Sequence, residues 1–284
     1  MAKVQRSTSA SIKMNKTIIY VVCIFLSLLS IMPFWIMIVN ATRSTPEIQG
    51  GLSLLPSIHA MSNLDVLLSK SFDPLKGFFN SLIISSSSTI LAVYFSSLTA
   101  YGLVAYNWKL RQPFFTVIMC VMLIPSQASA IGFYQFMYQL HWTNNFLPLI
   151  LPAIAAPAIV FFMRQYLLAT LSIEMVEASR VDGASEFYTF NRTVLPLMMP
   201  AIATQAIFAF VASWNNLFMP MILLTQQNKY TLPIMVSLLK GDIYKIEYGS
   251  IYMGLTLTVL PLFVIYFLLS RYIVAGVALG SVKD

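Results

Sequence analysis

Long stretches without charge are the feature that most constrains this chain. Five of them lack Asp, Glu, Lys and Arg, and they cover residues 17–42, 77–108, 112–163, 193–228 and 248–270. Because about 20 residues of α-helix cross the hydrocarbon layer of a bilayer, four stretches fit one helix each. The third fits two, with a break near residues 141–145. Only 10% of the residues are charged, which is too few to cover a water-soluble surface. We therefore predict an all-α integral membrane protein with six transmembrane helices.

The charge-free stretches also set the expected boundaries. A transmembrane domain is predicted over residues 17–272, between an N-terminal segment (1–16) and a C-terminal tail (273–284). The first span is longer than the apolar core of a signal peptide and lacks a clear cleavage site, so we predict that it is retained. The predicted spans are about 17–39, 80–104, 113–137, 145–168, 195–223 and 250–272.

The distribution of Lys and Arg predicts the orientation. With the N-terminus in the cytoplasm, eleven of these residues lie inside and six lie outside. Membrane proteins place the excess of Lys and Arg in their cytoplasmic loops. We therefore predict that both termini are cytoplasmic, and that the segment between the fourth and fifth spans is cytoplasmic as well.

The sequence contains no recognisable energy source or catalytic group. The charge-free stretches hold none of the acidic or basic relays that are typical of ion-coupled transporters, and no GxxxxGK[ST] loop is present to bind ATP. His59 and His141 are isolated, without a nucleophile–base pair or metal-ligand spacing. We expect no catalytic residues, no metal and no cofactor on this chain. The lack of a long basic run argues against nucleic-acid binding.

Polar residues within the predicted spans allow two interpretations. Ser85–Ser88 and the small residues that follow favour close helix packing, although some of them could line a polar path. Pro125 predicts a helix break beside polar groups, and such breaks are tolerated where they line a cavity. Amides and an indole suit a neutral hydroxylated solute, but interhelical hydrogen bonds explain them equally well. The candidate solute-path residues are Ser126, Gln127, Trp214, Asn215 and Asn216.

The cytoplasmic segment between spans four and five concentrates charge, and it contains the sequence EASRVDGASEF (177–187). Ser172 is predicted to cap a short helix with Glu174 near its positive end. Gly183 supplies a turn, and a second short helix leads into the fifth span. Small residues permit close approach of another surface, and Phe187 and Tyr188 could anchor it. These residues favour a docking surface, and an ordinary solvated loop is the alternative interpretation.

The same segment resembles the EAA motif of importer-type ABC permeases. That motif reads Glu-Ala-Ala, three residues, Gly, nine residues, Ile, any residue and Leu-Pro. The spacing matches here from Glu177 through Gly183 to Leu195-Pro196, with Ser179 and Thr193 as the two departures. Three segments resemble the sugar-importer branch of these permeases, in particular permeases similar to the maltose system's G subunit. They are EASRVDGASEFYTFNRTVLPLMMP, SWNNLFMP and SRYIVAGVALGSVKD.

The resemblance implies a type I ABC importer permease fold in the bacterial cytoplasmic (inner) membrane. A coupling helix would lie between spans four and five, within loop 169–193, and would dock on an ATPase subunit. The implied docking residues are Glu177, Ala178, Ser179, Asp182, Gly183, Ala184 and Phe187. The tail residues implied to contact the ATPase are Ser281, Val282 and Lys283.

The implied function is that of a pore-forming, non-enzymatic subunit of an ATP-driven, binding-protein-dependent importer for a sugar or oligosaccharide. It would work by alternating access. The implied partners are a homologous second permease, a dimer of cytoplasmic ATPases that hold ATP and Mg, membrane lipid, and an extracytoplasmic sugar-binding protein. That protein would contact the outer loops 43–76 and 225–247. The alternatives are an importer for an amino acid or another polar solute and, in a different class, a secondary carrier or membrane scaffold.

Overall fold

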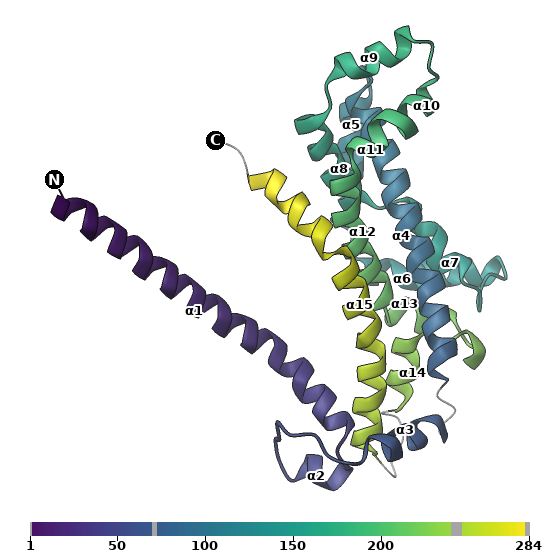
Figure 1. Ribbon diagram of the computed structural model, residues 1–284. Coiled ribbons are helices and arrows are strands. Elements are labelled where there is room, and N and C mark those ends of the chain that lie inside the picture. The colour runs from purple at the N-terminus through teal and green to yellow at the C-terminus, as the bar shows by residue number, and fades with distance from the viewer. Residues whose placement is uncertain (1, 70–72, 240–245, 282–284) are drawn as a thin grey trace. The chain divides into compact units, whose positions relative to one another are not determined.

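The computed structural model describes residues 2–69, 73–239 and 246–281, which form helices joined by turns and irregular segments, with no strand in those ranges. The chain divides into two compact units. Unit 1 comprises Met1–Phe72 and Leu239–Leu257, and unit 2 comprises Asp73–Leu238 and Thr258–Asp284. The elements (Figure 1) are α1 (Ala2–Ala41), α2 (Thr45–Gln49), α3 (Ala60–Ser69), α4 (Pro74–Val104), α5 (Arg111–Val121), α6 (Ser126–Gln139), α7 (Leu147–Ile150), η1 (Leu151–Ile154), α8 (Pro157–Thr170), α9 (Ile173–Val181), α10 (Glu186–Thr189), η2 (Phe190–Val194), α11 (Leu195–Leu197), α12 (Met199–Trp214), α13 (Phe218–Leu223), η3 (Gln227–Lys229), α14 (Leu232–Leu239) and α15 (Tyr248–Ser281).

Among the described residues, three helical segments are long and apolar enough to cross a membrane: Lys16–Ala41, Pro74–Ala105 and Leu147–Thr170. They overlap the predicted first, second and fourth spans. A fourth is added if Glu186–Leu197 and Met199–Trp214, which are joined by a bend of 80°, count as one span. The third and sixth spans, and with them the total of six, stay predictions.

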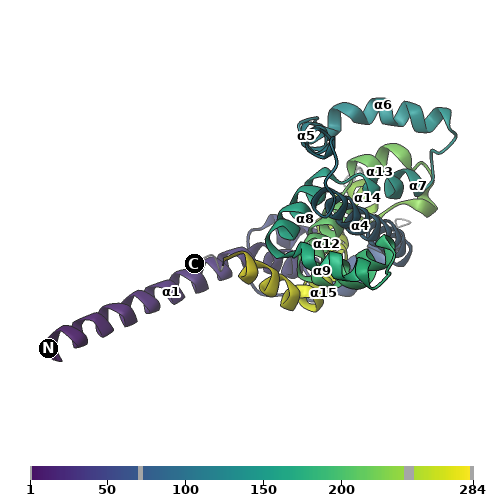
Figure 2. The ribbon, with the colours of Figure 1, turned by 90° about the horizontal axis from the view of Figure 1, so that it is seen from above.

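The break that Pro125 predicts within the third span is present, so this span is not one continuous helix. Helix α5 ends at Val121 and α6 begins at Ser126. The residue between them that breaks the helix is Pro125, which is extended with ψ of 124° and has no N–H to donate to a helical hydrogen bond. Figure 2 shows α5 nearly end-on and α6 lengthwise, so the chain turns sharply here. Each helix alone is shorter than the roughly 20 residues that a straight span needs.

Helix α4 is the central element of unit 2 and packs against both α8 and α12. At the N-terminus of α4, the Asp73 side chain accepts a hydrogen bond from the backbone amide of Lys76, and Pro74 occupies the first turn. Its buried face is made largely of small residues, which allow neighbouring helices to approach closely. Two serine hydroxyls donate to backbone carbonyls of adjacent segments: Ser88 to Leu149 at 3.2 Å and Ser96 to Ala156 at 3.4 Å. These contacts support the packing interpretation of the serine-rich segment.

Unit 1 contains a buried polar cluster between the end of α1 and the start of α3. The Arg43 guanidinium donates to Asn40 Oδ1 at 3.2 Å, to the Gly51 carbonyl at 3.0 Å and to the Glu47 carbonyl. The Asn63 amide donates to the carbonyls of Ala41 and Arg43 at 2.8 and 2.9 Å. Buried polar groups need such partners because leaving one unpaired costs about 1–3 kcal/mol. The cluster therefore fixes the path of residues 40–63.

Candidate functional site

The segment predicted to dock on an ATPase, residues 169–193, is called the docking loop below, and it contains two short helices joined by a tight turn. Helix α9 ends at Val181, and Gly183 follows with φ of 76°, the left-handed conformation that glycine adopts most easily. Ser185 caps α10 by accepting a hydrogen bond from the Tyr188 amide at 3.3 Å. The prediction for Ser172 is corrected in one respect. Its hydroxyl makes no side-chain cap and instead donates to the Glu174 carboxylate.

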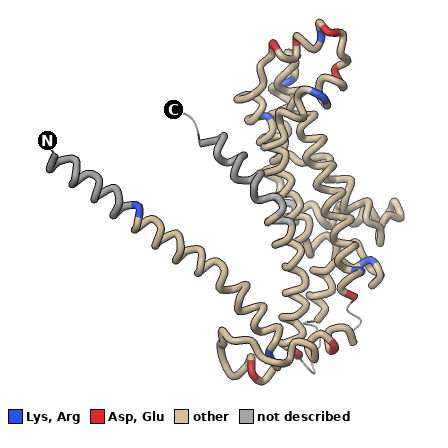
Figure 3. Tube along the Cα trace, in the orientation of Figure 1, with Lys and Arg blue, Asp and Glu red and all other residues tan. Residues whose placement is uncertain are grey.

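The predicted docking residues lie at or near the surface of this loop. Ser179 and Ala184 are half-buried, whereas the other predicted residues are exposed; these are Glu177, Ala178, Asp182, Gly183 and Phe187. Large side chains with apolar surface are exposed on this loop: Val181 is 88% exposed, Phe187 65% and Tyr188 58%. Figure 3 shows acidic and basic residues gathered on the same loop. Apolar side chains exposed together are typical of an interaction surface.

The docking loop is anchored in the interior of unit 2 on both sides of its turn. Val176 of α9 and Phe190 of η2 are fully buried, and they belong to one hydrophobic cluster with Tyr101 of α4 and Met163 of α8. The ring centroids of Tyr101 and Phe190 lie 5.6 Å apart. A force applied to the loop would therefore reach α4 and α8 directly through packed side chains.

A second connection between the loop and α4 is polar and converges on Glu186. Its carboxylate accepts hydrogen bonds from Arg180 Nε at 2.7 Å, from the Tyr101 hydroxyl at 3.2 Å and from the Tyr106 hydroxyl. The Arg180 guanidinium also lies over the Tyr106 ring, 5.3 Å from its centroid. These four residues, Arg180, Glu186, Tyr101 and Tyr106, are called the Glu186 cluster below.

The electrostatics of the Glu186 cluster favour the charged carboxylate. The hydrogen bond from Arg180 is the largest cause that lowers the pKa of Glu186, and the bond from Tyr106 adds to it. Burial and the bond to Glu186 raise the pKa of Tyr106, which keeps its hydroxyl protonated as a donor. A single exposed ion pair contributes only about 0–1 kcal/mol to stability. We therefore infer that this cluster mainly holds the loop in position against α4 and adds little to the stability of the fold.

The Glu186 cluster was not predicted from the sequence. Opposite charges at Arg180 and Glu186, on either side of the Gly183 turn, were the available signal for that pair. No comparable signal exists for Tyr101 and Tyr106, which lie some eighty positions earlier and meet Glu186 only in the folded chain.

Trp214, predicted as a solute-path residue, lies in the packed interior of unit 2. It is 1% exposed, and its indole N–H donates to the Thr258 carbonyl at 3.2 Å. Its ring stacks on Phe210, with centroids 5.6 Å apart, and meets Phe78 edge-on. For this residue the structure favours the interhelical alternative over direct contact with a solute.

The neighbouring amides are more open. Asn215 and Asn216 are exposed. Asn216 lines an open hollow in unit 2 together with Ser88, Ser213 and apolar residues, most of them alanines, from α4, α12 and the run from α7 to α8. Gln127 is exposed near the start of α6, outside that lining. Ser126 is the first residue of α6. The structure therefore brings Asn216 to a hollow and does not gather the other predicted residues around it.

The predicted tail contacts fall at the end of the described chain. Ser281 is the last residue of α15, whereas Val282 and Lys283 lie outside the described residues. Their contact with an ATPase stays a prediction.

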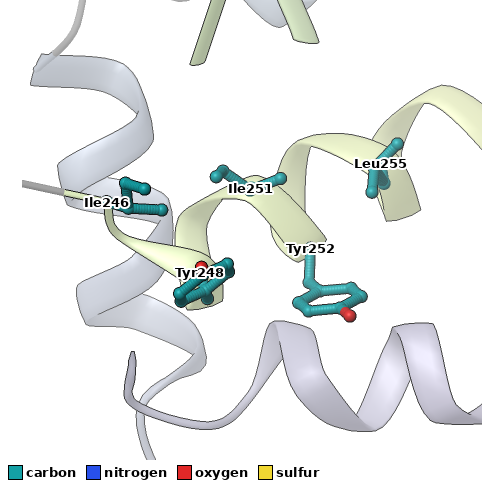
Figure 4. Close-up of a pocket in the computed structure, with 5 residues that line it drawn as sticks. All are labelled: Ile246, Tyr248, Ile251, Tyr252 and Leu255. Carbon is teal, nitrogen blue, oxygen red and sulfur yellow. The ribbon is translucent and has the colours of Figure 1, made fainter. Parts of the chain in front are cut away.

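Unit 1 contains a different hollow, at the start of α15 (Figure 4). It is lined by Ile246, Tyr248, Ile251, Tyr252 and Leu255, so tyrosine hydroxyls are its only polar side-chain groups. Within the described ranges, no group of three or more His, Cys, Asp or Glu side chains lies close enough to hold a metal ion.

Comparison of the fold with known structures identifies a related transporter. A chain in the crystal structure of a bacterial ABC transporter that imports the acidic polysaccharide alginate matches with a TM-score of 0.77. The match covers 92% of this chain and 97% of that chain, at 20% sequence identity. At that level of identity the match shows a shared fold.

Comparison of the sequence gives the family. The family described as "binding-protein-dependent transport system inner membrane component" matches residues 92–279. The arabinooligosaccharides transport system permease protein AraQ of Bacillus subtilis is 32% identical over 91% of this chain and 92% of its own length. The lactose transport system permease protein LacG of Rhizobium radiobacter is 31% identical over 93% and 95%. The trehalose/maltose transport system permease protein MalG of Thermococcus litoralis is 27% identical over 95% and 98%. The chain therefore belongs to the family of binding-protein-dependent transport system inner membrane components.

Proposed function

We propose that this chain is the pore-forming permease subunit of an ATP-driven importer for a sugar or oligosaccharide. The observation that carries the proposal is the similarity over nearly the whole length to permeases named for arabinooligosaccharides and lactose, at 32% and 31% identity. In this proposal the chain performs no catalysis, and ATP and Mg are held by a separate ATPase.

The docking loop is the proposed contact with that ATPase. Its exposed surface combines acidic groups such as Glu177 and Asp182 with the apolar side chains of Val181 and Phe187. The packing of Val176 and Phe190 into the core supports transmission of movement from the loop to α4 and α8. ATP binding and hydrolysis in the ATPase dimer would then switch the pore between outward-open and inward-open states.

The remaining partners are a homologous second permease and an extracytoplasmic binding protein that delivers the sugar. The outer loop 43–76 carries apolar side chains that suit a protein contact, since Leu55 is 76% exposed, Ile58 91% and Met61 70%. Large apolar groups exposed together are typical of interaction surfaces. This arrangement places both termini and the docking loop in the cytoplasm, as the Lys and Arg distribution predicts.

The solute path is proposed to run beside the hollow that Ser213 and Asn216 line in unit 2. Hydroxyl and amide groups exchange hydrogen bonds with sugar hydroxyls, and the alanines around them leave room for a polar solute. Ser126, Gln127 and Asn215 stay candidates for the solute path.

The test is reconstitution in proteoliposomes with the second permease, the ATPase and the binding protein. ATP is enclosed, and entry of radiolabelled arabino-oligosaccharide, lactose, maltose and an amino acid is measured. We expect ATP-dependent uptake of at least one sugar and none by the chain alone. ATP-driven uptake of the amino acid without any sugar would contradict the sugar assignment. Uptake by the chain alone, driven by a proton gradient, would contradict the permease assignment.

A further inference from the structure

We propose that Glu186 is a positioning residue that locks the docking loop to the end of α4, so that movement of the docked ATPase passes into the helix bundle. The inference deepens the proposed function and rests on it. It assigns a role in energy coupling to a residue that lies beside the predicted docking residues without being one of them.

The geometry gives Glu186 connections in two directions. Arg180, near the end of α9, donates to it from the other side of the Gly183 turn. Tyr101, within α4, and Tyr106, just beyond its end, donate to the same carboxylate. One side chain therefore joins both arms of the loop to each other and to the helix that packs against α8 and α12.

The hydrogen bonds that close the turn between the two arms lie within the loop itself, since the amides of Asp182, Gly183 and Ala184 donate to the carbonyls of Ala178, Arg180 and Ser179. Val176 and Phe190 are buried, but each lies several residues away from Gly183. Between them, Val181, Asp182, Gly183 and Ser185 are exposed, and a Cβ built on Gly183 would meet no atom within 4 Å. Without the Glu186 cluster, the loop would keep its links to α4 through the buried side chains of Val176 and Phe190 and through the hydrogen bond from Tyr94 to Asn191. These links lie away from the turn, so less of the movement of its tip would reach α4.

A carboxylate suits this position better than a neutral side chain. Its two oxygens offer about four acceptor sites, enough for three donors, whereas a glutamine amide offers only one oxygen. Hydrogen bonds to a charged acceptor are also roughly twice as strong as those between neutral groups. That strength matters because Arg180 and Glu186 are 37% and 46% exposed, so water competes for the same groups.

The first test measures coupling in the complete reconstituted transporter. Glu186→Ala is compared with Glu174→Ala, a matched control in the same loop whose carboxylate accepts from its neighbour Ser172. We expect Glu186→Ala to lower the number of sugar molecules imported per ATP hydrolysed severalfold, with normal recovery of the assembled complex. The control should leave the ratio unchanged. An unchanged ratio in Glu186→Ala, with uptake and ATPase activity falling together, would overturn the proposal.

A double-mutant cycle tests whether the tyrosine acts through the same carboxylate. Tyr106→Phe removes the hydroxyl and keeps the ring beneath Arg180, so its effect on the ratio should be smaller than that of Glu186→Ala. Because both changes break one connection, the double variant should be no worse than Glu186→Ala alone. Effects that add as if independent would contradict a shared role.

Hydrogen exchange of the full chain in lipid nanodiscs needs no ATPase. We expect the amides of α9 and α10 to exchange about tenfold faster in Glu186→Ala than in the wild type, as expected for local opening with less support, with unchanged exchange in the middle of α4. Equal protection of the loop in both proteins would overturn the positioning role. Failure of the wild-type chain to bind any ATPase would instead contradict the proposed function, and the exchange measurement would still decide on the role of Glu186.

Discussion

Gly249 packs so closely against the polar cluster of unit 1 that a side chain at this position would clash with it. A Cβ at this position would lie 2.5 Å from the Arg43 carbonyl oxygen and 2.6 Å from the amide nitrogen of Asn63. The same Asn63 amide holds the carbonyls of Ala41 and Arg43. A side chain at 249 therefore has to displace the group that fixes the path of the outer loop.

We predict that Gly249→Ala destabilises the protein by about 1–3 kcal/mol, the usual range for overpacking a closed site. Thermal unfolding of the purified chain in detergent measures the effect. Gly132→Ala is the control, because a Cβ at that position meets nothing within 4 Å. A melting temperature equal to that of the wild type in Gly249→Ala would show that Asn63 can move aside without loss.

Gly183 poses a different constraint, in which space is available but the backbone is unusual. Its φ is 76°, a conformation that asparagine tolerates better than most residues other than glycine. We predict that Gly183→Trp abolishes ATP-driven uptake while the chain still inserts in the membrane, because the bulky ring strains the turn and obstructs docking. Gly183→Asn should retain most uptake. Normal uptake by Gly183→Trp in the proteoliposome assay would contradict the docking role of the turn.

At the scale of helices, features that depend on neighbouring residues in the sequence could be predicted, and features that depend on contacts between distant segments could not. The charge-free stretches predicted segments that correspond to α1, to α4 and to the run from α7 to α8, because length and composition alone decide whether a helical segment can cross a bilayer. The Pro125 break was predicted from the missing N–H of proline. The change of direction between α5 and α6 was not, because it depends on which neighbours those helices contact.

The same distinction applies to the features of the docking loop. Its turn at Gly183, its two short helices and its exposed acidic and apolar residues followed from residue types and spacing. The 80° bend that follows α11 and the π-helical turn η2 did not. Burial of Val176 and Phe190, and the meeting of Glu186 with Tyr101, require contacts between distant segments that no local pattern records.

For the whole molecule, the sequence predicted the membrane class from its charge-free stretches and the transporter family from one spaced motif. The family is confirmed by the match over residues 92–279 and by relatives of nearly the same length. The solute path was predicted less well. Trp214 looked available for a sugar as part of a polar sequence, yet its ring is enclosed by Phe210 and Phe78 and its N–H is already bonded.

The central claim, that a separate ATPase drives this chain through the docking loop, is tested most directly by cross-linking in the assembled transporter. Exposed Cys23 and Cys120 are first replaced by Ser. A single cysteine is then placed at Val181 in the docking loop or, as a matched control, at Leu55 in the outer loop, positions that are 88% and 76% exposed. After treatment with a short bismaleimide, we predict that Val181→Cys links to the ATPase subunit and Leu55→Cys does not. An assembly that imports sugar but forms no link from position 181 to the ATPase, or that forms one from position 55, would contradict the account.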